Sequence, residues 1–125
     1  MFSIPTHHIL NTMCRRQVTE ALGFAADHYH SLPGFTEPRH GHIWRVEATA
    51  GGGDRERLAE ALGVWVATVD GMLLNDVDLL NGRNPTAETV AECAFLFLME
   101  AGIRPLMVKV WEKPHCWAAC IQETE

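Results

Sequence analysis

The chain has 125 residues, of which 47% are hydrophobic and 21% are charged, and its formal net charge is −6. This length and composition are typical of one globular domain, and we interpret residues 1–125 as a single domain with a modest core. The acidic balance argues against nucleic acid or an anionic membrane as a partner, and no apolar run reaches the roughly 20 residues of a membrane span.

Residues 1–17 show no clear hydrophobic periodicity, so we expect an arm or a poorly ordered start there. Residues 1–10 have neither the basic stretch nor the sustained apolar stretch of a signal peptide, so we expect none there. The four cysteines of the chain show no disulfide spacing, which is typical of free thiols in a reducing compartment. We therefore expect a cytoplasmic protein.

Two stretches in which apolar residues alternate, 18–29 and 40–50, predict strands that are separated by a loop. Side chains at i and i+2 lie on the same face of a strand, so His40 and His42 lie side by side at the end of an apolar row. His28 ends a similar row in the first strand. The loop between the strands would let the three imidazoles meet at one point.

Three neutral imidazoles suit a divalent metal, most often zinc, and leave a coordination position for water or substrate. We therefore predict a zinc site that is formed by His28, His40 and His42. His30 competes with His28 for this role, because it lies on the same face two residues further along the strand. The alternative for each of them is a hydrogen-bonded histidine in the core.

Two helices are predicted in the middle of the chain. Asp54 is expected to cap the first helix, in which apolar residues recur at helical spacing. Asn84 is expected to cap the second, with Pro85 at its first position, where the missing N–H costs nothing. Gly102 is expected to end this second helix, and its buried face would comprise Val90, Cys93, Ala94, Phe97 and Ala101.

Residues 107–112 and 117–122 alternate well enough to predict two further strands. The order of the elements is then β-β-α-α-β-β. This order predicts an α+β fold, with a four-stranded antiparallel sheet and two helices on one face.

Several motifs resemble those of the 6-pyruvoyl-tetrahydropterin synthase family, which includes the 6-carboxytetrahydropterin synthases. Phe-x-Ala-x-His at 24–28, followed by His-Gly-His at 40–42, resembles the zinc site of that family. Its later motifs are matched in the same order by Leu-Asn-Asp at 74–76, Asn-Pro-Thr-Ala-Glu at 84–88 and Val-Lys-Val-Trp-Glu at 108–112. The resemblance covers most of the chain.

This resemblance implies a tunnelling fold, in which the subunits join their sheets into a barrel and assemble as a trimer or a hexamer. It also implies zinc as the cofactor and a pterin as the small-molecule substrate. Glu112 matches the glutamate that binds the 2-amino and N3–H edge of the pterin, and Thr86 and Glu88 match residues near the pterin pocket. Without the resemblance, Glu112 is interpreted as a strand-end residue and the other two as residues that start a helix.

The chain departs from the family pattern where catalysis is expected. Most members have a cysteine base four residues before the His-Gly-His motif, where this chain has Thr36. Glu37 follows, giving Glu-x-x-His-Gly-His, a pattern that in one subgroup is associated with formation of 6-hydroxymethyl-dihydropterin. Asp70 matches the family's catalytic aspartate, but Gly71 replaces the histidine beside it. We therefore expect Glu37 and Asp70 to be the catalytic residues.

Three functions are compatible with these residues. The first is a zinc-dependent lyase that acts on the side chain of a 7,8-dihydroneopterin (triphosphate) type substrate, with Glu37 in place of the cysteine. The second is a 6-carboxy- or 6-pyruvoyl-tetrahydropterin synthase with a rearranged acid–base set. The third is a non-catalytic homologue that binds zinc and a pterin.

Overall fold

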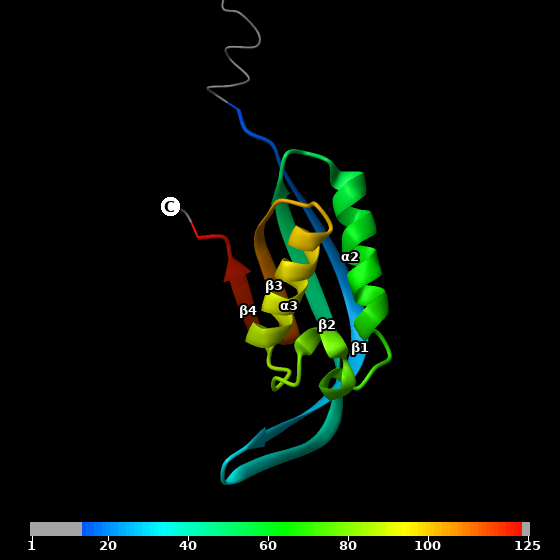
Figure 1. Cartoon of the computed structure of the whole chain (residues 1–125), viewed down its shortest axis with the longest axis vertical. Helices are drawn as coiled ribbons and strands as arrows, with labels where there is room; N and C mark the ends of the chain where they lie inside the picture. The colour runs from blue at the N-terminus through cyan, green and yellow to red at the C-terminus, as the bar shows by residue number, and fades with distance from the viewer. Residues whose placement is uncertain (1–13, 124–125) are drawn as a thin grey trace, which may run out of the picture.

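The structure, a computed structural model, describes residues 14–123. Four strands form one antiparallel sheet in the order β1-β2-β3-β4, and two helices cover one face of it (Figure 1). The elements are β1 (Gln17–Leu32), β2 (Phe35–Gly51), α2 (Arg55–Val69), two 3-10 turns (Leu74–Asp76 and Asp78–Leu80), α3 (Ala87–Glu100), β3 (Pro105–Lys113) and β4 (Cys116–Ile121). The predicted α+β fold is confirmed.

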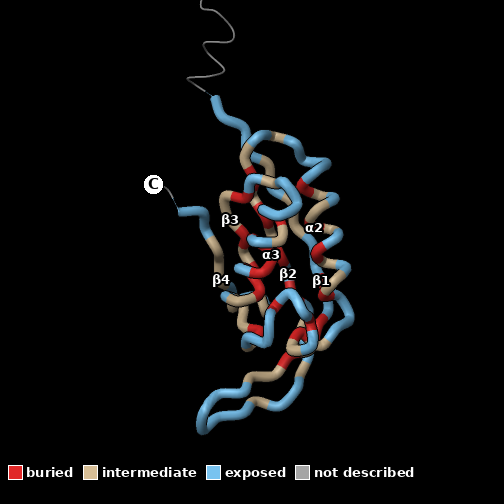
Figure 2. The backbone as a smooth tube through the Cα atoms, viewed as in Figure 1, coloured by how far each residue is buried: buried red, intermediate tan, exposed pale blue. Residues whose placement is uncertain are grey.

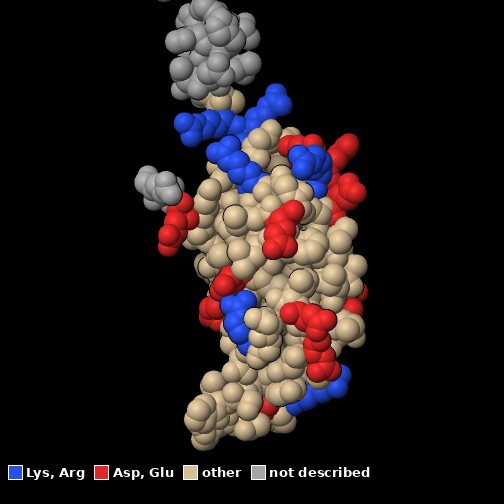
Figure 3. Space-filling model, in the orientation of Figure 1, with Lys and Arg blue, Asp and Glu red and all other residues tan. Residues whose placement is uncertain are grey.

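The arm predicted for residues 1–17 lies almost entirely outside the described residues, and Gln17 already belongs to β1. Within residues 14–123, no helix has both the length and the apolar character needed to span a membrane. Acidic and basic side chains are both present on the face that Figure 3 shows, and acidic ones are spread over most of its length.

The core lies between the sheet and the two helices, where the buried residues gather (Figure 2). Trp44 on β2 and Trp65 on α2 are completely buried. Phe24 on β1 stacks on Trp44 at 5.9 Å and meets Trp65 edge to face at 5.6 Å. Aromatic pairs of this geometry stabilise a core beyond the area that they bury. They fix β1, β2 and α2 relative to one another close to His42, which lies two residues before Trp44 on the same face of β2.

The first hairpin differs from the sequence prediction. The sequence predicted a loop between residues 30 and 40. In the structure both strands instead continue through this region to a tight turn, in which Gly34 has a φ of +79°. The extended hairpin projects beyond the helices and is mostly exposed (Figure 2).

This hairpin contains a β-bulge. His28 pairs with His40, but His30 pairs with Glu37, so that β2 has one more residue than β1 between the two pairs. A bulge changes the alternation of side chains along the strand that carries it. It brings Glu37 onto the face of His40, although the two residues are an odd number of positions apart.

The helix starts agree only partly with the sequence prediction. Asp54 caps α2 as predicted, and its Oδ1 accepts a hydrogen bond from the Arg57 amide at 3.0 Å. The cap of α3 is Thr86 rather than Asn84, because the Asn84 side chain bonds the backbone of Ser31 in β1 instead. The predicted buried face is also incomplete, since Ala101 is exposed whereas the structure additionally buries Ala91, Phe95 and Leu98.

The segment that links the two helices closes the outer edge of β1. Backbone N–H groups of four alternate residues in β1 donate to it, in the pairs Ala25–Asp70 Oδ1, Asp27–Met72 O, Tyr29–Asn75 Oδ1 and Ser31–Asn84 Oδ1, at 2.9–3.0 Å. Unpaired strand edges invite pairing with other chains, so this segment protects the half of β1 that carries the histidines.

Asn75 makes the most complete of these contacts, because its amide also donates to the Tyr29 carbonyl at 3.0 Å. We expect Asn75→Ala to lower the free energy of unfolding by about 1–3 kcal/mol, since it leaves two backbone groups of β1 without partners. Urea denaturation measures this change. Asp78→Ala in the same segment is the control, because that side chain is exposed and has no hydrogen bond within residues 14–123. Equal stability of the two variants would contradict the role of Asn75.

Candidate metal centre

Three histidines and a glutamate meet at one point of the sheet. His28 comes from β1, His40 and His42 from β2 and Glu112 from β3, and one ligand atom of each lies within 4.8 Å of the others. We call these four residues the histidine cluster. The sequence prediction that His28, His40 and His42 lie together agrees with this geometry.

Two backbone carbonyls orient the imidazoles. His28 Nδ1 lies 2.8 Å from the Pro85 carbonyl oxygen, and His40 Nδ1 lies 2.8 Å from that of Pro38. A carbonyl oxygen only accepts hydrogen bonds, so Nδ1 carries the hydrogen in both rings, and in the neutral rings the Nε2 atoms carry lone pairs. These two Nε2 atoms are 3.1 Å apart. Two facing lone pairs repel each other unless a cation lies between them, and metal-bound histidines are commonly oriented in this way.

His42 and Glu112 complete the donor set. Glu112 Oε1 lies 2.9 Å from His28 Nε2 and 3.1 Å from His42 Nε2. His42 Nε2 is nevertheless buried without a hydrogen-bond partner within the described part of the chain. Burial lowers the pKa of His42 from its ordinary 6.5, against the opposing effect of the Glu112 carboxylate, and so favours the neutral ring that binds metals. Imidazole nitrogens and a carboxylate oxygen are donors that suit zinc.

Steric crowding explains why a glycine, Gly41, lies between His40 and His42. A Cβ atom on Gly41 would lie 2.6 Å from Asp27 Oδ1, because the Asp27 side chain passes over this position. The other carboxylate oxygen of Asp27 lies 2.9 Å from Arg39 Nε. Gly41 therefore allows a cross-strand ion pair on the face opposite the histidines.

Glu37 contacts the cluster at His40, the most exposed of its histidines. Glu37 Oε1 lies 3.0 Å from His40 Nε2, and Oε2 lies 3.1 Å from His30 Nδ1. The side chain of Glu37 is 34% exposed, so it is open to a ligand. The bulge in β2 is what brings it there.

A cavity of about 330 Å³ adjoins the cluster. The three residues that the resemblance assigns to pterin binding all line it, namely Thr86, Glu88 and Glu112. Thr86 has a second role there, since its hydroxyl oxygen caps α3 by accepting from the Thr89 amide. The remaining lining residues were not singled out as substrate-binding by the sequence, namely His30, Ala87, His115, Cys116 and Trp117. Cys116 lies in the final hairpin, so only the fold reveals that a thiol lines this cavity.

Asp70 is not part of the histidine cluster or of this cavity. It is exposed, and its Oδ1 accepts the Ala25 amide at 2.9 Å. The backbone amide of the next residue, Gly71, donates a hydrogen bond to the carbonyl oxygen of Ala25. Within the described chain, the Asp70 side chain therefore binds the edge of β1 at Ala25. Its catalytic role stays a prediction.

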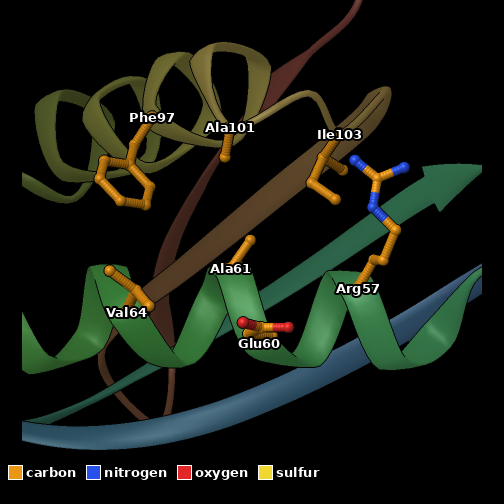
Figure 4. A pocket seen from close by; sticks show the side chains of 7 residues that line it. All are labelled: Arg57, Glu60, Ala61, Val64, Phe97, Ala101 and Ile103. Carbon is orange, nitrogen blue, oxygen red and sulfur yellow. The ribbon is translucent and has the colours of Figure 1, made fainter.

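A second cavity, of about 310 Å³, lies between the helices (Figure 4). Ala61 and Val64 of α2 face Phe97 of α3 and Ala101, the residue after α3, across it, and Arg57 lies toward one end (Figure 4). The Arg57 guanidinium donates to the Gly102 carbonyl. No residue of the histidine cluster lines this cavity.

The family model for 6-pyruvoyl tetrahydropterin synthase matches residues 17–123. The chain belongs to this family. The resemblance that its motifs indicated is thus confirmed. Members of the family are lyases of pterin metabolism and use zinc, which fits the donor set of the histidine cluster.

Solved structures of the family show the same fold. The 6-pyruvoyl tetrahydropterin synthase of Caenorhabditis elegans superposes with a TM-score of 0.76 at 18% identity, over 89% of this chain and 98% of that one. The Plasmodium falciparum protein gives 0.69 at 14% identity, over 88% and 99%. A Plasmodium vivax 6-pyruvoyltetrahydropterin synthase gives 0.65 at 13% identity, over 87% and 99%, and is described as a mutant in which a catalytic glutamate is replaced by cysteine. A search of the curated proteins finds no significant match.

His28 and His40 should contribute differently to the free energy of unfolding of the metal-free protein. His28 is completely buried and bonded to Pro85, whereas the His40 side chain is 31% exposed. We expect His28→Ala to lower the free energy of unfolding by about 2–4 kcal/mol, through a cavity and an unpaired carbonyl. His40→Ala should cost about 1 kcal/mol or less. Urea denaturation in the presence of a chelator compares them, and equal losses would contradict this difference.

Proposed function

We propose that this protein is a zinc-dependent lyase that acts on the side chain of a 7,8-dihydroneopterin or 7,8-dihydroneopterin triphosphate and releases 6-hydroxymethyl-7,8-dihydropterin. The observation that carries the proposal is the position of Glu37, which contacts both the histidine cluster and His30. His30 lines the cavity together with Thr86, Glu88 and Glu112. A carboxylate thus lies where metal ligands and a substrate-sized cavity meet.

His28, His40 and His42 would hold the zinc and leave a fourth position for the substrate, while Glu112 beside them stays available for the ring. When bound, zinc would supply a Lewis acid that polarises the oxygens of the substrate side chain and acidifies its hydroxyl groups. Glu37 would accept a proton from the side chain, because an ordinary glutamate is in its basic form at neutral pH. The proton comes from the hydroxyl group on the second carbon of the side chain, and the retro-aldol cleavage breaks the bond between the first and second carbons. The outer two carbons leave as glycolaldehyde, or as its triphosphate, and Glu37 can return the proton to the carbon that stays on the ring.

Glu112 would anchor the pterin ring. A carboxylate accepts two parallel N–H bonds, which matches the 2-amino and N3–H edge of a pterin. Glu112 lines the cavity and also approaches His28 and His42, so it joins the ring-binding residues to the cluster. Thr86 and Glu88 would line the rest of the ring site.

The Plasmodium vivax protein supports a carboxylate in this role, because its catalytic residue is described as a glutamate. A second function also has an observation in its favour. Cys116 lines the cavity, so a 6-carboxy- or 6-pyruvoyl-tetrahydropterin synthase with a rearranged acid–base set would have a thiol available. A non-catalytic protein that binds zinc and a pterin is the third alternative, since Gly71 stands where the family has histidine and Asp70 bonds the backbone of β1.

We also propose that copies of the chain join through their sheet edges, as a trimer or a pair of trimers. The part of β1 before Ala25 pairs only with β2 among the described strands, and β4 pairs only with β3. These two edges lie on opposite sides of the sheet (Figure 1). β4 and β1 also run in opposite directions, so β4 of one copy can continue the antiparallel pattern with β1 of the next. A closed ring would leave no open edge.

We propose the cytoplasm as the location of the protein. The cysteines at 14, 93, 116 and 120 are all free thiols, as a reducing compartment requires.

The metal site predicts one zinc ion per chain, bound without a cysteine. We expect His42→Ala to lower the zinc retained after dialysis at least about tenfold, because a lost ligand removes more than the roughly 1.4 kcal/mol that corresponds to a factor of ten. Atomic emission measures the zinc. Cys93→Ala is the control, because this thiol is buried in the core on α3. A His42→Ala protein that keeps a full equivalent of zinc would exclude this site.

The role of Glu37 predicts that Glu37→Gln folds and binds zinc but loses activity. The amide preserves size but is not a base, so turnover should fall by about 10²–10⁴-fold. Incubation with dihydroneopterin and with its triphosphate, followed by mass spectrometry of the products, measures this change.

Glu47→Gln is the matched control for Glu37→Gln, because Glu47 lies on the same strand but contacts Arg45 on the opposite face. An active Glu37→Gln protein together with an inactive Cys116→Ser protein would assign the acid–base role to the thiol and support the second function. If the parent protein binds pterins but converts neither substrate, the third alternative is supported.

A further inference from the structure

His30 lies beside the histidine cluster without belonging to it. It follows His28 on the same face of β1, and the two rings meet edge to face at 5.0 Å. Its Nδ1 lies 3.1 Å from Glu37 Oε2, and its side chain is 20% exposed. The bulge in β2 places Glu37 directly opposite His30 in the sheet. Neither the metal set nor the ring site described above uses this imidazole.

Glu37 depends on His30 for a hydrogen-bond donor. The other oxygen of Glu37 lies near His40 Nε2, but His40 Nδ1 is bonded to the Pro38 carbonyl. In the neutral ring, His40 Nε2 therefore carries a lone pair and has no hydrogen to donate. Within the described residues, His30 is the remaining side chain at hydrogen-bonding distance from this carboxylate. A glutamate that no donor holds keeps several rotamers, which works against a fixed position next to a substrate.

The second nitrogen of His30 has a different environment. Once Nδ1 carries the hydrogen, Nε2 is an acceptor. This Nε2 is buried and has no hydrogen-bond partner within residues 14–123. His30 also lines the cavity that Thr86, Glu88 and Glu112 line. A buried acceptor without a partner is unfavourable, so a donor on a ligand in the cavity would satisfy it.

We propose that His30 holds the Glu37 carboxylate in place through Nδ1 and recognises a hydroxyl group on the ligand's side chain through Nε2. This inference rests on the proposed function, because it needs a ligand whose ring occupies the cavity and whose hydroxylated side chain points to Glu37. His30 is then a positioning residue for Glu37 and a specificity residue for hydroxylated side chains. Ring binding stays with Glu112, Thr86 and Glu88.

Two substitutions separate the roles of the two nitrogens. In His30→Asn, the side-chain amide can place a donor near the position of Nδ1 and leaves nothing near that of Nε2. In His30→Gln, the amide lies near the position of Nε2 and leaves nothing near that of Nδ1. His30→Phe keeps a planar ring and removes both. Comparison of the three variants with the parent, all loaded with zinc, therefore tests each contact by itself.

The first measurement is equilibrium binding, which does not depend on turnover. The probes are neopterin, whose side chain carries hydroxyl groups, and pterin, which has no side chain. We expect His30→Phe and His30→Asn to bind neopterin about tenfold more weakly than the parent, which corresponds to one lost hydrogen bond. Pterin should bind all variants within about twofold, because it cannot reach Nε2. His30→Gln should recover most of the neopterin affinity.

The second measurement is the split between kcat and KM on the substrate that the parent converts. His30→Phe should lower kcat and raise KM. We expect His30→Asn to recover kcat while KM stays raised, and His30→Gln to show the opposite pattern. A residue that only supports the fold would change both constants together in all three variants, and that result would overturn the inference.

Three further outcomes are decisive. Equal affinity of the parent and all three variants for neopterin would reject hydroxyl recognition by His30. Loss of zinc from His30→Phe and His30→Asn would make His30 a metal ligand and reject the proposal. Failure of the parent to bind either probe would reject the proposed function itself, whereas normal binding by the parent with unchanged variants rejects the role of His30 alone.

Discussion

His28 and His40 face each other across β1 and β2 with their Nε2 atoms 3.1 Å apart, and the rest of the site is built around this pair. The carbonyls of Pro85 and Pro38 turn both rings so that their lone pairs converge. Such an arrangement is unfavourable without a cation, so the hairpin must be held together by other contacts. The buried Trp44 provides one of them, because it packs against His28 and bonds the backbone of β1.

The bulge that follows the His28–His40 pair changes which face of the hairpin carries Glu37. A regular ladder would turn Glu37 toward the face of Asp27 and Arg39, away from the cluster. One extra residue in β2 instead turns its carboxylate toward His30 and His40. The same region projects beyond the helices and stays exposed, which leaves this side of the cluster accessible. Bulges next to active sites commonly redirect a side chain in this manner.

The segment between α2 and α3 determines which part of β1 stays available for pairing with another chain. It bonds alternate residues of β1 from Ala25 to Ser31, and this explains where Asp70, Asn75 and Asn84 direct their side chains. The half of β1 with the histidines is therefore closed to any other chain. Pairing between copies would use the part of β1 before Ala25, at a distance along the strand from the metal ligands. The site and the expected subunit contact thus occupy different parts of one strand.

Local patterns in the sequence were sufficient to predict the architecture and the grouping of the three histidines. Alternation with period two shows which residues of one strand share a face, so it placed His40 with His42 and joined His28 to its own apolar row. Alternation also predicted that Glu112 lies on the inward face of its strand. It could not reveal that β3 brings Glu112 next to the imidazoles. Such patterns hold only while the ladder is regular and say nothing about contacts between distant segments.

The tertiary structure alone decided the remaining features. The bulge broke the alternation at Pro38 and Arg39, so the sequence could not assign a face to Glu37 or pair it with His30. The bond between Asn84 and Ser31 moved the cap of α3 to Thr86, because a long-range hydrogen bond outweighed a local capping preference. Cys116 reached the cavity by the same kind of long-range packing, which no local pattern records.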